Sequence, residues 1–157
     1  MSLKKPLVLG SNGQIQQIQS GDTLDAAIIE TESITLLNGE SSDAITIGMP
    51  AYISAADTVK KAKADAAGTA TAFALCKTAS ITAATTGEFF TSGQLASSNW
   101  AAVTGGTTLT AGSIYYLSNG TAGQITVTPP TTGLLVEVGQ AISTTTLQIK
   151  IKRPILL

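Results

Sequence analysis

The sequence predicts a mainly β protein, a small antiparallel β-sandwich or barrel, and three observations support this fold class. Residues 146–152 alternate apolar and polar side chains, which is typical of a strand with one buried and one solvent-facing side. Turn residues separate several short β-branched runs in the last third of the chain. Charged residues make up 12% of the chain and aromatic residues 4%, so Thr, Ser, Ala and Gly dominate and favour strands and turns.

The last third of the chain, residues 109–157, contains the clearest expected strands. Asn119–Gly120 marks a turn, and Pro129 ends a strand because proline has no amide hydrogen for the ladder. Gly139 marks an expected bulge or bend. The expected strands are Ile114–Leu117, Gln124–Thr128, Leu134–Val138 and Thr146–Lys152.

Residues 1–45 are expected to form an extended N-terminal arm or docking segment, followed by a β-domain over residues 46–157. Gln14–Gln19 fits neither an ideal strand nor a helix long enough to stand alone. Ser33–Leu37 is a predicted strand, Asn38–Gly39 predicts a hairpin turn, and Ala44–Ile47 resumes the β pattern. The first fifty residues lack a core of their own, so we expect them to gain order from a partner.

A weak internal repeat links the middle of the chain to its last third. Gly48–Ser54 shares a glycine, a tyrosine, an aliphatic residue and a serine with Gly112–Ser118. Each of these two segments is followed by a turn, then a strand-like segment, then an apolar strand. The apolar strand is Thr71–Cys76 in the first copy and Leu134–Val138 in the second. Two similar β-units, packed face to face or in one barrel, would explain the repeat. The alternative is chance similarity in a sequence of low diversity.

Two further segments lie within the expected β-domain. Lys60–Ala72 is rich in alanine and could form a helix by propensity, but Gly68 and the internal repeat favour strand and turn. Gly87–Gly93 is an expected aromatic strand, and Thr104–Thr107 an expected loop.

The residue types needed for common catalytic chemistry are sparse, so we expect no enzyme, no metal site and no cofactor. The chain has no histidine, and its single cysteine, Cys76, lies in an apolar run typical of a buried strand. Four acidic residues gather near the expected arm, but their spacing is not that of a calcium loop, and solvated charges explain them better. They are Asp22, Asp25, Glu30 and Glu32.

The charge balance argues against nucleic acid as a partner. Nine Lys and Arg face ten Asp and Glu, for a net charge of −1, whereas phosphate binding needs a clustered basic surface. No run of eighteen or more apolar residues occurs, so no membrane span is expected. A single cysteine excludes an intrachain disulfide framework and suits a reducing cytoplasm.

The last third also resembles tailed-bacteriophage virion proteins, described variously as capsid decoration (cement) proteins, head-fibre proteins or tail-fibre-like proteins. The opening stretch, Lys5–Leu24, is similar to the start of many such proteins. Together the two stretches cover under half of the chain, and neither carries a catalytic motif. The matching residues of the last third are Gly112, Tyr115, Tyr116, Leu117, Ser118, Gly123, Pro130, Gly133, Val136, Val138, Gly139, Ala141, Ser143, Leu147, Ile149, Ile151, Pro154 and Ile155.

The resemblance implies a virion structural protein on the capsid surface, assembled in the cytoplasm of the bacterial host. Its expected partners are the major capsid protein and further copies of itself in a homotrimer. The alternative is a tail-fibre, spike or baseplate component that attaches to the host, for which a host glycan is the expected ligand. The residues expected to dock on the capsid are Lys4, Lys5, Pro6, Leu7, Leu9, Ile15 and Ile18.

Overall fold

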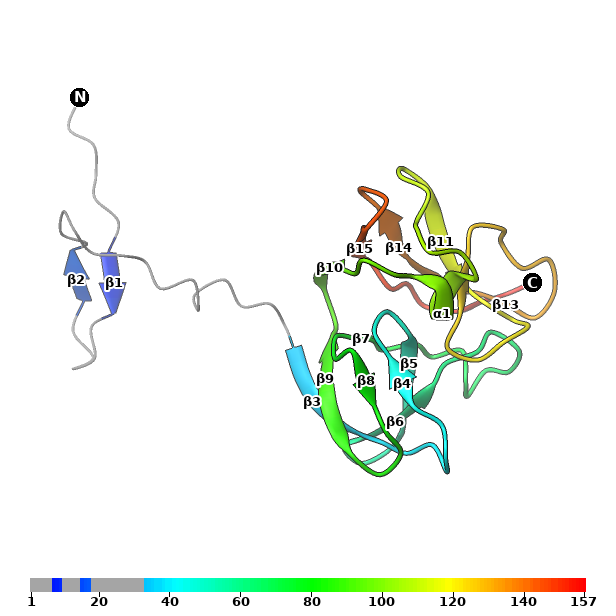
Figure 1. The fold of residues 1–157 in the computed structure, drawn as a ribbon, viewed down its shortest axis with the longest axis horizontal. Helices are drawn as coiled ribbons and strands as arrows, with labels where there is room; N and C mark the ends of the chain where they lie inside the picture. The colour runs from blue at the N-terminus through cyan, green and yellow to red at the C-terminus, as the bar shows by residue number, and fades with distance from the viewer. Residues whose placement is uncertain (1–6, 10–14, 18–32) are drawn as a thin grey trace. The chain divides into compact units, whose positions relative to one another are not determined.

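The computed structural model of the chain describes residues 7–9, 15–17 and 33–157 (Figure 1). Internal contacts divide the chain into an N-terminal segment, Met1–Glu30, and a compact body, Thr31–Leu157. In the N-terminal segment, β1 (Leu7–Leu9) pairs antiparallel with β2 (Ile15–Gln17). The sequence pattern at β2 suggested no regular element, and the pairing with β1 supplies the hydrogen bonds that a three-residue strand cannot supply alone.

The first half of the compact body contains a closed five-stranded barrel, which we call the first β-unit. Around the barrel the strands run in the order β3, β6, β5, β7 and β9, and all pairs are antiparallel except β3–β6. A separate pair, β4 with β8, lies beside it. The strands are β3 (Ser33–Asn38), β4 (Ile45–Thr46), β5 (Pro50–Ala55), β6 (Thr58–Lys61), β7 (Ala74–Cys76), β8 (Ser80–Ile81) and β9 (Thr86–Phe90).

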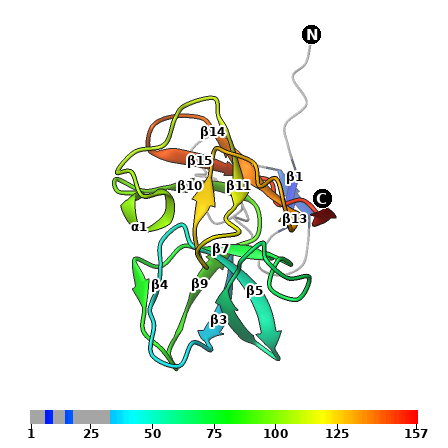
Figure 2. The same cartoon turned by 90° about the vertical axis from the view of Figure 1, so that its right-hand side faces the viewer.

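The second half contains an open five-stranded antiparallel sheet, the second β-unit, with strand order β10-β15-β14-β11-β12. A short helix lies between β10 and β11 in the chain, and a two-stranded sheet, β13 with β16, completes the body. Figure 2 shows the second unit above the barrel. The elements are β10 (Gly93–Ala96), α1 (Ala101–Thr104), β11 (Ile114–Leu117), β12 (Ile125–Thr126), β13 (Leu134–Leu135), β14 (Glu137–Ala141), β15 (Thr146–Ile149) and β16 (Ile155–Leu156).

The two β-units share one topology. In each unit the first strand (β3 or β10) pairs with the last strand (β9 or β15). The other neighbour of that last strand is β7 in the first unit and β14 in the second. That strand pairs with a central strand (β5 or β11), whose other neighbour is the strand that follows it in sequence (β6 or β12). Only the parallel contact that closes the barrel, β3 with β6, has no counterpart in the second unit.

The backbone repeats in detail where the sequences are similar. Gly48 and Gly112 precede the two central strands with φ angles of 84° and 81°. The Gly48 amide donates to the Cys76 carbonyl at 2.8 Å, and the Gly112 amide donates to the Ala141 carbonyl at 2.7 Å. The predicted pair of similar β-units is therefore confirmed, and chance similarity does not account for it. The two units form separate sheets rather than sharing one barrel.

Two hydrophobic clusters form the core. The smaller cluster joins the barrel to the β4–β8 pair and includes Phe89 of β9 and Ile81 of β8. The larger cluster contains side chains from both units, among them Leu75 and Phe90 of the first and Trp100 of the second. The two units therefore bury apolar surface against each other, which offsets the small side chains that dominate each unit.

The sequence predicted a hairpin at Asn38–Gly39, and this was wrong. The strand before it, β3, pairs with β6 and β9, while the strand after it, β4, pairs with β8. Gly39 is still needed at this position, because a Cβ there would lie 2.5 Å from Thr58 Cγ2 of β6. The close approach of β3 to β6, rather than a tight turn, explains the glycine.

The expected arm, residues 1–45, includes a strand of the barrel. Ser33–Asn38 pairs with β9 over five residues, and Leu36 and Asn38 are buried. The first three residues of β3 are exposed, and only its C-terminal half is packed in the barrel. The strand therefore lacks the full alternating pattern that would have indicated a buried strand in the sequence. A division at residue 45 as a functional boundary stays a prediction.

The expected strand Leu134–Val138 was wrong as a single strand, because Leu134–Leu135 pairs with β16 while Glu137–Ala141 belongs to the larger sheet. The expected strands Gln124–Thr128 and Thr146–Lys152 are present but shorter. Lys60–Ala72 forms the end of β6 followed by turns, without a helix. The expected irregularity at Gly139 is confirmed, because the register between β11 and β14 skips Val138. The helix α1 was not predicted, since four residues are too few for a helical pattern.

The repeat offers a matched test of the contact between the units. At both Gly48 and Gly112 an alanine must adopt a left-handed backbone, which costs on the order of 1 kcal/mol. A Cβ at Gly48 would also lie 2.7 Å from Trp100 Cζ3, whereas nothing lies within 4 Å of a Cβ at Gly112. We expect Gly48→Ala to lower the free energy of unfolding more than Gly112→Ala, measured by urea denaturation. Equal losses would contradict the packing of Trp100 on Gly48.

Candidate docking surfaces

The residues expected to dock on a partner lie in the N-terminal segment. Leu7 and Leu9 belong to β1, and Ile15 to β2, where Leu9 is paired with Ile15 in the antiparallel register. The other expected docking residues, Lys4, Lys5, Pro6 and Ile18, lie outside the described residues. The four acidic residues near the arm also lie outside them. The docking assignment therefore stays a prediction.

The C-terminal end of the compact body exposes a run of apolar side chains. Ile155, Leu156 and Leu157 are 60%, 79% and 53% exposed, although Ile155 and Leu156 form β16. Because β13 and β16 form a sheet of two strands, β16 has one edge without a strand partner among the described residues. Exposed apolar side chains on an open strand edge are typical of an interaction site. The sequence shows that these residues are apolar but does not indicate that they are exposed.

A shallow groove lies at the edge strand of the second unit, with a volume of about 200 Å³. Its floor includes Tyr115, whose hydroxyl accepts a hydrogen bond from the Thr110 amide at 2.9 Å. Val127, just after β12, is 47% exposed at its rim. The groove is lined by Thr104, Gly106, Thr108, Thr110, Tyr115, Ile125, Thr126 and Val127, so its surface is hydroxyl-bearing and apolar without a charged side chain.

A wider cavity of about 500 Å³ lies where the two units meet. Thr46 contributes to its lining, and the Thr46 hydroxyl is buried without a hydrogen-bond partner among the described residues. None of the lining side chains carries a charge, so the cavity offers no group for acid–base chemistry. The lining residues are Thr46, Ile47, Ala79, Ala96, Ser97, Ser98, Asn99 and Ala102.

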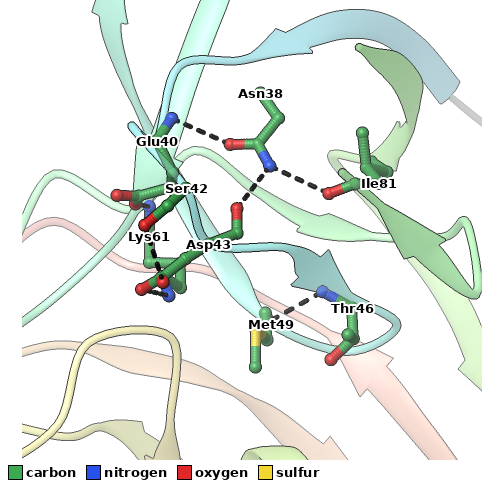
Figure 3. A network of polar contacts seen from close by, with 8 residues as sticks. All are labelled: Asn38, Glu40, Ser42, Asp43, Thr46, Met49, Lys61 and Ile81. Carbon is green, nitrogen blue, oxygen red and sulfur yellow. Dashed lines mark hydrogen bonds and ion pairs between the residues drawn. The ribbon is translucent and has the colours of Figure 1, made fainter. Parts of the chain in front are cut away.

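The most buried polar side chain of the described body, Asn38, has a structural role. Its amide nitrogen donates to the carbonyls of Asp43 and Ile81, each at 2.9 Å, and its oxygen accepts from the Glu40 amide at 2.9 Å (Figure 3). Asn38 thus links the end of β3 to the following loop and to β8. These three hydrogen bonds offset the cost of burying the amide.

A second set of contacts joins the same loop to β6. The Lys61 amide donates to a Glu40 carboxylate oxygen at 2.8 Å, and the Lys61 ammonium pairs with Asp43 at 2.8 Å (Figure 3). The hydrogen bond from Lys61 lowers the pKa of Asp43 below its usual value, and the positive charge of Lys61 adds to the effect. Asp43 is exposed, so the pair fixes the loop geometry more than it stabilises the fold.

Cys76 is buried in the core of the barrel, as the sequence predicted. Its thiol donates to the Thr78 carbonyl at 3.2 Å. Burial raises the pKa of Cys76 from 9.0 to about 12, and the backbone contact at Thr78 opposes this only in part. A thiol with a raised pKa and no access to solvent is a packing residue rather than a nucleophile.

The raised pKa of Cys76 predicts a loss of stability at alkaline pH. As the pH rises above 9.0, the thiol ionises in the unfolded chain but stays protonated in the folded protein until about pH 12. The free energy of unfolding should fall through this window by at most about 1.4 kcal/mol per pH unit from this group. Urea denaturation of the wild type and of Cys76→Ala at pH 8–11 should show a smaller pH dependence in the variant. Identical pH dependences would contradict the assignment.

The tyrosine pair of the last third divides between core and surface, as expected for consecutive strand residues. Tyr115 is buried in the larger core cluster, and Tyr116 is half-buried. Tyr116 lines a small surface cavity together with Glu137 and Lys152, which form an ion pair. At most one of the two rings is therefore available to a ligand.

Within the described residues, no helix is both long and apolar enough to span a membrane. The same residues contain no group of three or more His, Cys, Asp or Glu side chains placed to hold a metal ion. In comparisons with known proteins, no family model, no curated protein and no solved structure matched the chain.

Proposed function

We propose that this protein is a bacteriophage virion structural protein that decorates and stabilises the capsid by binding the major capsid protein. It acts through non-covalent contacts, as a closed cyclic homotrimer on the capsid surface. It bridges neighbouring capsomers by burying small apolar and main-chain surface, so that the pressure of packaged DNA is shared between them. No cofactor and no catalytic step are needed for this role.

The division of the chain into two parts is the observation that best supports this proposal. A compact body of two packed β-units is separate by its internal contacts from the N-terminal segment, Met1–Glu30. A separate segment that carries apolar strand residues can reach a partner surface while the body keeps its fold. The similarity of Lys5–Leu24 to the start of phage structural proteins falls within this segment.

Deleting residues 1–24 tests the docking role of the N-terminal segment. We expect the truncated protein to keep its unfolding transition, because the compact body begins at Thr31, and to lose binding to capsids that lack the native protein. Co-sedimentation with such capsids measures the binding. A full-length control with residues 1–24 in scrambled order keeps the length and composition of the segment and should also fail to bind. Normal binding by the truncated protein would place the docking surface elsewhere.

A tail-fibre, spike or baseplate component is the second candidate. The half-buried Tyr116 and the threonine-lined groove could contact a host glycan through stacking and hydroxyl groups. Immunogold labelling of complete virions separates the candidates, since a decoration protein labels the head and an attachment protein labels the tail.

A further inference from the structure

The repeated topology identifies a strand position that is filled in the first β-unit and empty in the second. In the barrel, β3 covers the outer edge of β6 by parallel pairing, with Leu37 opposite Thr58 and Asn38 opposite Val59. The counterpart of β6 is β12, and the counterpart of β3 is β10, but these two strands are the opposite edges of an open sheet. β12 therefore has a strand partner on one side only within the described residues.

The segment that follows β10 occupies part of the space left by the missing pairing. The helix α1 of this segment contacts β12. The remaining opening is the groove lined by Ile125, Thr126, Val127 and the loop at residues 104–110. It combines an open strand edge with apolar and hydroxyl side chains, which suits an uncharged extended peptide.

The same chain carries a segment with matching chemistry. The strand β16 has a free edge and exposes Ile155 and Leu156, with Leu157 beside them. These residues are uncharged and extended, and they are already held in strand geometry by β13, with Leu134 opposite Leu156. Because the strand is held in place, adding it to a second edge costs less ordering entropy than adding a free tail.

We propose that β16 of one copy docks along β12 of the next copy, in the groove lined by Val127, so that copies associate head to tail. The contact joins two different surfaces of the chain, so it is heterologous and generates a ring when the rotation between copies closes. The self-association is part of the proposed function, but this interface needs no capsid. Its test on purified protein can therefore fail or succeed independently of capsid binding.

Two charge substitutions disrupt the two sides of the contact separately. Val127→Lys places an ammonium group at the rim of the groove, and Leu156→Lys places one on the most exposed side chain of β16. Both side chains are exposed at 47% and 79%, so neither change disturbs the core. Ile142→Lys is the matched control, because Ile142 is 52% exposed on the turn between β14 and β15.

Light scattering coupled to size exclusion gives the mass of each full-length protein. We expect the wild type and Ile142→Lys to form the same closed oligomer, and Val127→Lys and Leu156→Lys each to run as a monomer of 15.9 kDa. Circular dichroism and thermal unfolding check that both variants remain folded. A monomeric wild type, or folded variants that keep the wild-type mass, would overturn the proposal.

Mixing the two variants tests the head-to-tail arrangement. The Val127→Lys protein keeps an intact β16, and the Leu156→Lys protein keeps an intact groove, so an equimolar mixture should form a 1:1 dimer with one working interface. The double variant should stay monomeric in every mixture. Absence of the mixed dimer would exclude the head-to-tail contact. The proposal would also be overturned if deleting residues 1–24 abolished the oligomer while the Leu156→Lys protein kept it. That result would indicate that the N-terminal segment, and not β16, occupies the groove.

Discussion

Replacing Trp100 with alanine is expected to lower the free energy of unfolding by about 3–5 kcal/mol, the usual range for deleting a fully buried aromatic side chain. Trp100 is the largest of the fully buried side chains and belongs to the cluster shared by the two β-units. Its indole nitrogen donates to the Thr145 carbonyl at 3.1 Å. The substitution therefore leaves a cavity between the units and removes one of two hydrogen bonds to the Thr145 carbonyl, which still accepts from the Ser97 amide at 2.9 Å.

Trp100→Phe separates these two contributions. Phenylalanine keeps an aromatic ring in the core but lacks the Cε3 and Cζ3 atoms that lie near Gly48, and it cannot donate to Thr145. We expect its loss to be about 1–2 kcal/mol, closer to that of one hydrogen bond and a small cavity. Urea denaturation, followed by circular dichroism, measures both variants. A loss below about 1 kcal/mol for Trp100→Ala would contradict the assignment of Trp100 to the core between the units.

Replacing Gly139 with alanine is expected to cost on the order of 3 kcal/mol or more, at the upper end of overpacking effects. Gly139 lies in β14 between β11 and β15, opposite Tyr115 on one side and Ile149 on the other. A Cβ at this position would collide with the carbonyl oxygen of Gln148 in β15. Because the obstacle is backbone within a paired strand, it cannot rotate away as a side chain could.

Gly68→Ala is the matched control for Gly139→Ala. Nothing lies within 4 Å of a Cβ at Gly68, and its φ angle is not in the left-handed region. We expect this control to unfold like the wild type, within about 0.5 kcal/mol. Thermal unfolding of the two variants side by side measures the difference, and equal melting temperatures would refute the close approach of β14 and β15 at Gly139.

The internal repeat was visible in the sequence because glycine has a conformational role at matching positions. Gly48 and Gly112 both adopt positive φ angles before a central strand, so the same residue recurs wherever the unit recurs. The alternating pattern at Leu147 and Ile149 was equally informative, since both side chains are buried in the larger cluster. The glycine positions and the alternating side chains both depend on local backbone geometry, so they can be predicted from a short stretch of sequence.

Pairing between distant strands could not be predicted in the same way. The parallel contact of β3 with β6 depends on how the barrel closes, and no local pattern distinguishes it from a hairpin at Asn38–Gly39. The difference between the closed first unit and the open second unit is of the same kind. The groove at β12 follows from that difference and therefore emerged only from the three-dimensional arrangement.

The docking residues were predicted from the sequence, whereas the exposed C-terminal surface was found only in the structure. The docking residues were inferred from the resemblance at Lys5–Leu24 and from the lack of a core in the first fifty residues, and they stay a prediction. The exposed run Ile155–Leu157 reads in the sequence as a strand end, because apolar residues predict burial. Its exposure depends on the absence of a covering element in the described body.

Capsid decoration is tested most directly by adding the purified full-length protein to expanded capsids that lack it and imaging the particles by cryo-electron microscopy. We expect ordered density for the two β-units at symmetry-related positions on the shell, with the N-terminal segment in contact with the major capsid protein. Bare shells, with the protein located at the tail of complete virions, would contradict it and favour the attachment role.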